Sequence, residues 1–202
     1  ALEKGAKRPA GEPDRKVSRL GVIGAGMMGA GIAHVGLMAG MEVVLIDRDD
    51  AATERGAATV AKLLDSSVKA RALDAAAREA TAARLTPTTD LAALSDCDLV
   101  IEAVFEDTRV KTEVLTAAAA HLGPEAIIAT NTSTLPVSDL AAAAPDPARF
   151  LGIHFFSPVH RMMLVEIIMG RDTGDRALAT ALDFVRQLRK TPIVVNDARF
   201  FY

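Results

Sequence analysis

The sequence has 202 residues, of which 50% are hydrophobic and only 4% aromatic. That length suffices for one well-buried domain, or for one domain with appendages. The formal net charge of −3 argues against a broad basic surface for nucleic acid, and the scarcity of aromatic side chains argues against a surface that stacks bases. We therefore expect no nucleic-acid partner.

Cys97 is the single cysteine, which excludes an internal disulfide framework and fits a reducing compartment. No apolar run approaches the roughly 20 residues that a membrane-spanning helix needs, and the first residues lack the apolar core of a signal peptide. The sequence also contains no Cys/His cluster with metal-ligand spacing. It therefore predicts a cytoplasmic protein with no transmembrane segment and no metal.

Residues 1–18 are charged and are interrupted by Pro9, Gly11 and Pro13. Such a stretch is expected to bury little surface, so we interpret it as a linker or tail. A remnant of a purification tag is the alternative, although the stretch is irregular for one. The folded domain is expected over residues 19–202.

Beyond residue 18, short apolar runs alternate with helical patterns. Strands are expected over 19–24, 41–47, 99–104, 126–130, 149–158, 163–170 and 191–195, with a further short strand after residue 84. Helices are expected over 27–39, 50–80, 111–122 and 174–190, and a break near the middle of the second is an alternative. This alternation predicts an α/β fold with a doubly wound, mostly parallel sheet.

A glycine fingerprint, Gly24-x-Gly26-x-x-Gly29, follows the first expected strand. In a Rossmann-type fold the first glycine permits a tight turn, the second lets a pyrophosphate approach the backbone, and the third allows close contact between helix and strand. The helix N-terminus that follows offers unpaired N–H groups to phosphate. A tight turn that binds no nucleotide is the alternative.

Asp47 ends the next expected strand, about 20 residues after the fingerprint, where an acidic residue accepts hydrogen bonds from the ribose hydroxyls. Its carboxylate would repel a 2′-phosphate, so NAD is favoured over NADP, although Arg48 beside it could tolerate a phosphate. Met27 and Met28 lie inside the fingerprint. We expect them beside the cofactor as packing residues rather than as ligands.

Two polar motifs follow later strands. The segment VIEAVFEDTRVK carries Glu106 and Lys111, and a solvated start of a helix is the alternative for both charges. The segment ATNTST carries Asn131 and Ser133, which could donate hydrogen bonds to a substrate oxygen. Capping of a helix that begins near Pro136 is equally compatible with this motif.

A third motif, GIHFFSPVHRMMLVEII, places His154 at the end of one apolar run and Glu166 within the next. If the two strands are neighbours, the two side chains can meet. A carboxylate fixes the tautomer of an imidazole and stabilises its protonated form, as a general base requires. Because an unpaired buried glutamate is costly, we predict that the two residues form a pair.

Several of these motifs occur in one order, namely GVIGAGMMGAGIA, DLVIEAVFED, ATNTST, GIHFFSPV, LVEII and KTPIVVND. In this respect residues 17–200 resemble the NAD-binding domain of the 3-hydroxyacyl-CoA dehydrogenase family. The resemblance implies NAD-dependent oxidation of an L-3-hydroxyacyl-CoA in fatty-acid β-oxidation. It implies that His154 is the catalytic base, that Glu166 orients it, and that Ser133 hydrogen-bonds the 3-oxygen. The cofactor-binding residues that it adds to the fingerprint and Asp47 are Ala103, Val104, Glu106, Lys111 and Asn131.

The resemblance also implies a place for the acyl-CoA substrate, against the long helix after Asp47. There Ser66, Lys62 or Lys69 could meet the CoA moiety, and an exposed helix face is the alternative. In the family, VVND leads into a glycine-containing turn and a helical C-terminal domain, which carries a catalytic asparagine and the dimer contact. The ending NDARFFY lacks that glycine. We therefore expect this chain alone to bind NAD without turnover, and the longer parent to be oligomeric.

Residues 2–18 resemble the linker that follows an enoyl-CoA hydratase domain in multifunctional fatty-acid oxidation proteins, and HFFSPVHRM is closer to that group than to single-function enzymes. We therefore expect a multifunctional parent with hydratase (lyase) activity and a possible thiolase partner subunit. A stand-alone 3-hydroxybutyryl-CoA dehydrogenase and a non-catalytic NAD-binding module are the alternatives.

Overall fold

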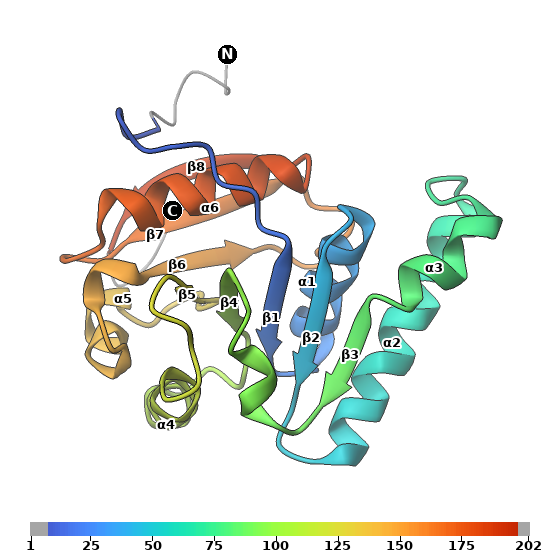
Figure 1. Cartoon of the computed structure of the whole chain (residues 1–202), viewed down its shortest axis with the longest axis horizontal. Coiled ribbons are helices and arrows are strands. Elements are labelled where there is room, and N and C mark those ends of the chain that lie inside the picture. Colours follow the sequence, from blue (N-terminus) through green and yellow to red (C-terminus); the bar gives the residue numbers. More distant parts are fainter. Residues whose placement is uncertain (1–7, 198–202) are drawn as a thin grey trace.

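The computed structural model describes residues 8–197, which form one eight-stranded sheet in the order β3-β2-β1-β4-β5-β6-β7-β8 (Figure 1). All neighbouring strands are parallel except β6 and β7, which are antiparallel. The predicted doubly wound, mostly parallel sheet is thus confirmed. The strands are β1 (Arg19–Ile23), β2 (Glu42–Ile46), β3 (Leu85–Thr88), β4 (Leu99–Glu102), β5 (Ile127–Thr130), β6 (Phe150–Phe155), β7 (Leu164–Met169) and β8 (Thr191–Asn196).

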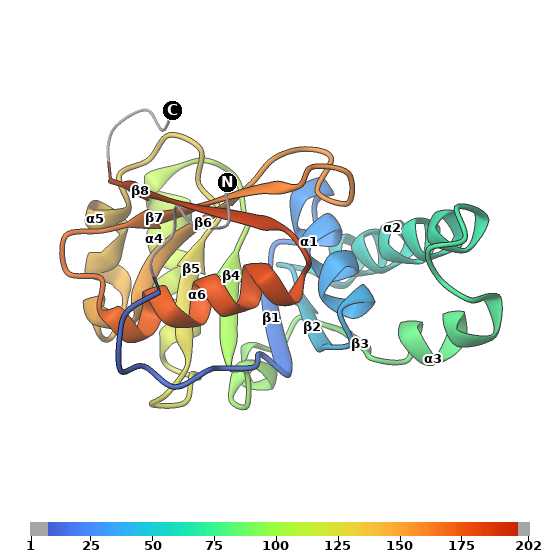
Figure 2. The ribbon, with the colours of Figure 1, turned by 90° about the horizontal axis from the view of Figure 1, so that it is seen from above.

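Helices cover both faces of the sheet, and α2 and α3 project beyond its β3 edge (Figure 2). The α-helices are α1 (Met27–Met38), α2 (Asp50–Lys69), α3 (Arg78–Ala82), α4 (Thr108–Ala119), α5 (Val137–Leu140) and α6 (Asp175–Gln187). Short 3₁₀ turns are η2 (Ala75–Ala77), η3 (Leu91–Leu94), η4 (Ala141–Ala143) and η5 (Pro147–Arg149). Within residues 8–197, no helix combines the length and the apolar character needed to cross a membrane.

The core follows from the alternation of side chains along each strand. In β4, Leu99 and Ile101 belong to the core beneath α1, α2 and α6, whereas Val100 belongs to the core beneath η3 and α4. Because successive side chains of a strand point to opposite faces, a strand buried on both sides is apolar throughout. This explains the continuous apolar runs in the sequence.

Several predicted boundaries were wrong, and two of them are instructive. The helix expected over 50–80 ends at Lys69, and α3 begins only at Arg78, so the alternative with a break describes it better. Arg71 adopts a φ of 57°, a left-handed conformation that ends a helix. The strand expected over 99–104 ends at Glu102, because Glu102 turns its carboxylate back to accept a hydrogen bond from the Val104 amide.

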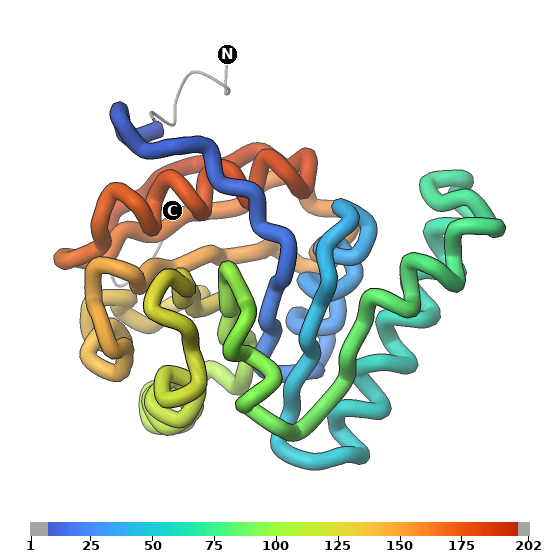
Figure 3. The backbone as a smooth tube through the Cα atoms, viewed as in Figure 1, coloured from blue at the N-terminus to red at the C-terminus, as the bar shows by residue number. Residues whose placement is uncertain are grey.

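The segment 8–18 is not the loose tail that its composition predicts, because it docks along α6 (Figure 3). Arg8 donates through Nε and Nη2 to the carboxylate of Asp183, which also accepts from the Arg15 amide. The side-chain amide of Gln187 then makes two hydrogen bonds with the backbone of Val17. Polar side chains of α6, together with the burial of Val17 in the main core, thus hold this segment in place.

Candidate functional site

The site lies at the carboxyl edge of the parallel strands, beside the point where the strand order reverses. β1 is paired with β2 on one side and with β4 on the other, so the chain leaves the sheet in opposite directions from β1 and β4. In a doubly wound sheet such a switch point opens the crevice in which ligands bind. The fingerprint, Asp47 and the polar motifs all follow strands that end at this edge.

The glycine fingerprint forms the turn between β1 and α1. Gly24 has a φ of +101°, and a Cβ there would lie 2.6 Å from the carbonyl oxygen of Ala103. A Cβ on Gly29 would lie 1.7 Å from the carbonyl oxygen of Gly24, so helix and strand meet only because this side chain is missing. At Gly26 a Cβ would meet nothing within 4 Å. That position leaves free space at the helix N-terminus, as a bound pyrophosphate requires.

Asp47 is held by two backbone amides, since Oδ2 accepts from Ala25 N and Oδ1 from Arg48 N, both at 2.7 Å. A carboxylate has about four acceptor positions, so both oxygens can still accept from ribose hydroxyls. Asp47 borders a cavity of about 650 Å³ whose wall also includes Gly24, Gly26, Ala103, Val104 and Phe105. The turn, the carboxylate and the cavity together fit a dinucleotide.

The two methionines of the fingerprint lie differently. Met27 is 73% exposed at the start of α1, whereas Met28 is half-buried against the main core. Neither side chain borders the 650 Å³ cavity. Packing fits Met28, but Met27 packs against little in the described part of the chain.

A buried ion pair lies directly beneath the crevice. Lys111 is fully buried, and its Nζ donates to Oε1 of Glu102 at 2.8 Å. The other oxygen of Glu102 accepts from Thr130 Oγ at 2.7 Å. The solvated helix start considered for Lys111 is therefore wrong. Glu102 and Thr130 were not predicted, although a glutamate inside the apolar run LVIE already signals a buried carboxylate that needs a partner.

Glu106 organises the polar loop that follows β5. Its Oε1 accepts from Thr132 Oγ at 2.6 Å and from the Ser133 amide at 2.9 Å, and its Oε2 lies 3.3 Å from Lys111 Nζ. Burial acts to raise the pKa of Glu106, but these hydrogen bonds and Lys111 outweigh it, and the pKa is lowered. The exposed hydroxyl of Ser133 is 3.4 Å from the same oxygen. Asn131 ties β5 to β6, because its Oδ1 accepts from the Phe155 amide at 2.9 Å.

His154 and Glu166 face each other across the antiparallel strands β6 and β7. His154 Nδ1 lies 2.7 Å from Glu166 Oε2, with 16% of the His154 side chain and 5% of the Glu166 side chain exposed. An ionised carboxylate only accepts hydrogen bonds, so in the neutral imidazole Nδ1 carries the hydrogen and Nε2 keeps its lone pair. The predicted pairing is confirmed, and the arrangement suits a general base.

The three residues proposed for the CoA moiety lie on one face of α2 and are exposed. Ser66 borders a second cavity, of about 800 Å³, between α1, α2 and the loop 156–163. Lys62 and Lys69 do not border it. The basic side chains around this cavity, to which the sequence assigned no binding role, are His34, His160, Arg161, Arg189 and Lys190.

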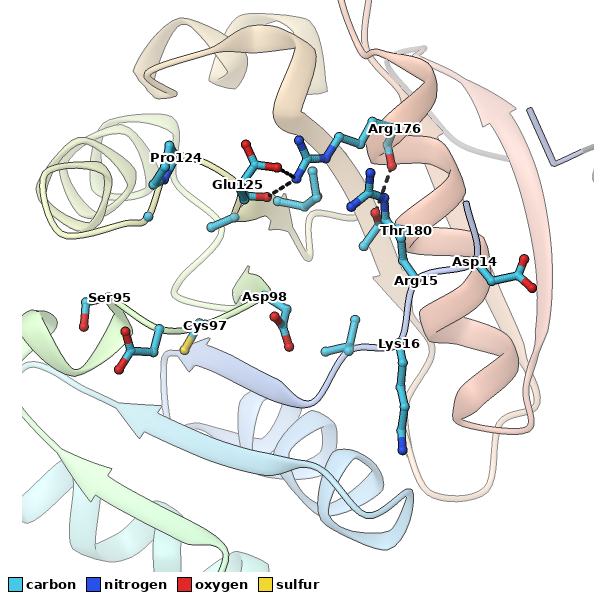
Figure 4. A pocket seen from close by; sticks show the side chains of 15 residues that line it. Asp14, Arg15, Lys16, Ser95, Cys97, Asp98, Pro124, Glu125, Arg176 and Thr180 are labelled. Atoms are coloured by element: carbon cyan, nitrogen blue, oxygen red, sulfur yellow. Dashed lines mark hydrogen bonds and ion pairs between the residues drawn. The ribbon is translucent and has the colours of Figure 1, made fainter. Parts of the chain in front are cut away.

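A third cavity, of about 540 Å³, opens at the opposite edge of the sheet, beneath the segment 8–18 (Figure 4). Several of its charged groups already have partners within the fold. Arg176 pairs with Glu125, and Asp98 accepts from the amides of Ser18 and Arg19. This cavity therefore serves as a structural junction. Within residues 8–197 no three His, Cys, Asp or Glu side chains converge as a metal site.

The family model described as 3-hydroxyacyl-CoA dehydrogenase, NAD binding domain, matches residues 19–198. The chain belongs to the 3-hydroxyacyl-CoA dehydrogenase family. The match, together with the glycine turn and Asp47, confirms NAD as the cofactor. The roles of individual residues in the reaction stay predictions.

Solved structures of other dehydrogenases have the same fold. The (S)-3-hydroxybutyryl-CoA dehydrogenase of Ralstonia eutropha is 38% identical, with a TM-score of 0.89 over 93% of this chain and 66% of that one. The 3-hydroxybutyryl-CoA dehydrogenase of Escherichia coli is 35% identical, with a TM-score of 0.88 over 93% and 40%. The dehydrogenase part of multifunctional enzyme 1 from C. elegans is 31% identical, with a TM-score of 0.81 over 93% and 43%. The chain thus spans two thirds or less of the length of these relatives.

Proposed function

We propose that this chain is the NAD-binding half of an enzyme that oxidises an L-3-hydroxyacyl-CoA to the 3-oxoacyl-CoA. The observation that carries the proposal is the hydrogen bond of 2.7 Å between His154 and Glu166, at the same sheet edge as the glycine turn. A nucleotide-binding module without chemistry has no need of an imidazole oriented by a buried carboxylate. The non-catalytic alternative therefore leaves this pair unexplained.

In the proposed reaction His154 Nε2 takes the proton of the 3-hydroxyl, so that an O–H bond breaks and an N–H bond forms. The C3–H bond breaks with its electron pair, and the electrons of the former O–H bond complete the carbonyl. Bound NAD supplies the acceptor for the hydride that leaves C3. Glu166 offsets the charge that appears on His154, and the Ser133 hydroxyl donates a hydrogen bond to the oxygen as the carbonyl forms.

We place the CoA moiety in the 800 Å³ cavity beside α2. Arg161, Arg189 and Lys190 border it, and no aspartate or glutamate among residues 8–197 does. Such a wall suits a ligand that carries several phosphate groups. Ser66 is the member of the predicted substrate set that this placement supports, whereas Lys62 and Lys69 would contact only parts of the ligand outside the cavity.

The test is the replacement of His154 by alanine in the full-length protein. We expect kcat for acetoacetyl-CoA-dependent NADH oxidation to fall about 10²–10⁴-fold, the usual contribution of a positioned general base, while NAD binding by calorimetry stays unchanged. His121→Ala, which removes an exposed histidine just after α4, is the matched control. Turnover by His154→Ala at the level of the control would refute the proposal.

We further propose a multifunctional parent that acts in fatty-acid β-oxidation, with a preceding enoyl-CoA hydratase domain. The resemblance of residues 2–18 to the linker of such proteins supports this, and a thiolase subunit, an oligomeric state and a cytoplasmic location belong to the same proposal. Hydration of crotonyl-CoA by the full-length protein is the expected result. Failure to hydrate crotonyl-CoA, with dehydrogenase activity retained, would support a stand-alone dehydrogenase.

A further inference from the structure

Lys190, just after α6, is a buried lysine that takes no part in the proposed proton and hydride transfer. Only 8% of this residue is exposed, and its Nζ donates to the carbonyl oxygens of Val159 at 2.7 Å and of Met162 at 2.6 Å. Within residues 8–197 no carboxylate lies within ion-pair distance of it. Burial lowers the pKa of Lys190, so the protein holds this ammonium against a desolvation cost.

Packing alone does not require a lysine at this place. A methionine of similar length would fill the same space without bringing a charge out of water. An ammonium offers three donors from one point, and can therefore draw two carbonyl groups of one loop toward a single atom. The shape of that loop is what the lysine adds.

The loop in question, residues 156–163, connects the strand of His154 to the strand of Glu166. Besides Lys190 it has two other anchors. Val159 is buried against α1, where a Cβ on Gly31 would come within 2.9 Å of it. The Thr191 amide donates to the carbonyl oxygen of Met163 at 2.8 Å. The loop is thus held by packing against α1 on one side and by a hydrogen bond from the start of β8 on the other.

The two carbonyl groups that bind Lys190 bracket His160 and Arg161, which form part of the wall of the 800 Å³ cavity. None of these residues borders the 650 Å³ cavity at the glycine turn. We propose that Lys190 is a positioning residue that holds this wall in the shape that receives the acyl-CoA. The proposal rests on the proposed function, and it assigns Lys190 to the substrate side of the site alone.

Lys190→Met in the full-length protein tests the proposal. We expect KM for acetoacetyl-CoA to rise about tenfold, the scale of one charge-assisted hydrogen bond, while kcat changes little and KM for NADH stays the same. Such a split is typical of lost binding that is equally strong in the ground state and the transition state. Arg189→Gln is the matched control, because it removes the same charge from the same cavity without touching a loop carbonyl.

Measuring KM at low and high salt distinguishes a positioning role from direct attraction of the ligand's charge. An attraction between exposed charged groups is screened at high ionic strength. We expect the loss in Lys190→Met to persist in salt, and any loss in Arg189→Gln to be smaller and to disappear. Equal, salt-sensitive losses in both variants would overturn the proposal, as would an unchanged KM in Lys190→Met. If Lys190→Met does not fold, Val159→Ala loosens the same loop and is expected to give the same split.

Amide hydrogen exchange tests the positioning role of Lys190 independently of the proposed dehydrogenase function. Amides of residues 156–163 are expected to exchange faster in Lys190→Met than in wild type, while those of α1 and α4 are unaffected. A wild-type protein that neither binds nor reduces acetoacetyl-CoA would refute the proposed function, and exchange would still report whether Lys190 holds the loop. Unchanged exchange in this loop refutes the positioning role even in an active enzyme.

Discussion

The imidazole of His154 and the carboxylate of Glu166 are directly opposed residues of the antiparallel strands β6 and β7, joined by a hydrogen bond of 2.7 Å. This is the single antiparallel pairing among the described strands. It brings together two side chains that lie twelve residues apart in the sequence. The reversal of chain direction at 156–163 is therefore what assembles the proposed base.

Glu166→Gln is expected to lower kcat by up to about 10⁴-fold, as in enzymes whose orienting carboxylate becomes an amide and fixes the wrong tautomer. An amide can donate to Nδ1, which then leaves the hydrogen on Nε2. NAD affinity should not change, because Glu166 does not border the cofactor cavity. Steady-state kinetics on the full-length protein provide the measurement, with exposed Glu54→Gln as control. A loss no larger than in the control would mean that Glu166 is only structural.

Asp47→Asn is expected to weaken NAD binding by about 10–100-fold, because charge-assisted hydrogen bonds to the ribose are lost. The affinity for NADP should rise relative to that for NAD, because the charge that repels a 2′-phosphate is gone and Arg48 is adjacent. Calorimetric titration with both nucleotides measures this ratio. Asp50→Asn makes the same chemical change in the first turn of α2, outside the cavity wall, and should alter neither affinity. If Asp47→Asn and Asp50→Asn had the same ratio of NAD to NADP affinity, Asp47 would not be the ribose-binding residue.

Lys111→Met is expected to lower the free energy of unfolding by about 3–5 kcal/mol, because it leaves the buried carboxylate of Glu102 without its cation. Adding Glu102→Gln should recover part of that loss. Urea unfolding of both variants gives the two values. Arg109→Ala on the same helix, which breaks an exposed pair with Glu113, should cost at most about 1 kcal/mol. A similar small loss for Lys111→Met would show that the buried network is not structural.

His34 is expected to make the fold sensitive to mild acid. Burial, assisted by nearby His160 and Lys190, lowers the pKa of His34 to about 4, against about 6.5 in the unfolded chain. As the pH falls, the unfolded state therefore binds a proton before the folded state does. The contribution of His34 to the free energy of unfolding is complete above pH 6.5 and declines between pH 6.5 and pH 4.

This proton uptake is expected to lower the free energy of unfolding by about 2 kcal/mol at pH 5 relative to pH 7. His34→Gln cannot titrate, so its unfolding free energy should fall less over the same range. Urea unfolding of both proteins at pH 7 and pH 5 measures the difference. Parallel losses in the two proteins would mean that other groups, rather than His34, account for the acid sensitivity.

Several features of this protein could be predicted from short stretches of its sequence. Gly24, Gly29 and Asp47 could be recognised because their requirement is local, namely a turn, a close contact and a ribose partner at fixed spacing. The order of strands and helices followed from periodicity for the same reason. The pairing of His154 with Glu166 was also predictable, since a glutamate within an apolar run needs a partner and few are available.

Tertiary structure alone decided the partners of residues that are distant along the chain. Glu102 can be recognised as a carboxylate that needs a partner, but only the fold shows that Lys111 and Thr130 provide it. Likewise, segment 8–18 resembles a tail until Asp183 and Gln187 of α6 bind it. Lys190 resembles a solvated helix end until the loop 156–163 turns its carbonyls inward. In each case a polar group is retained by contacts whose geometry depends on the whole sheet. The sequence by itself determined the fold and the cofactor, and packing across the sheet determined how the site is held.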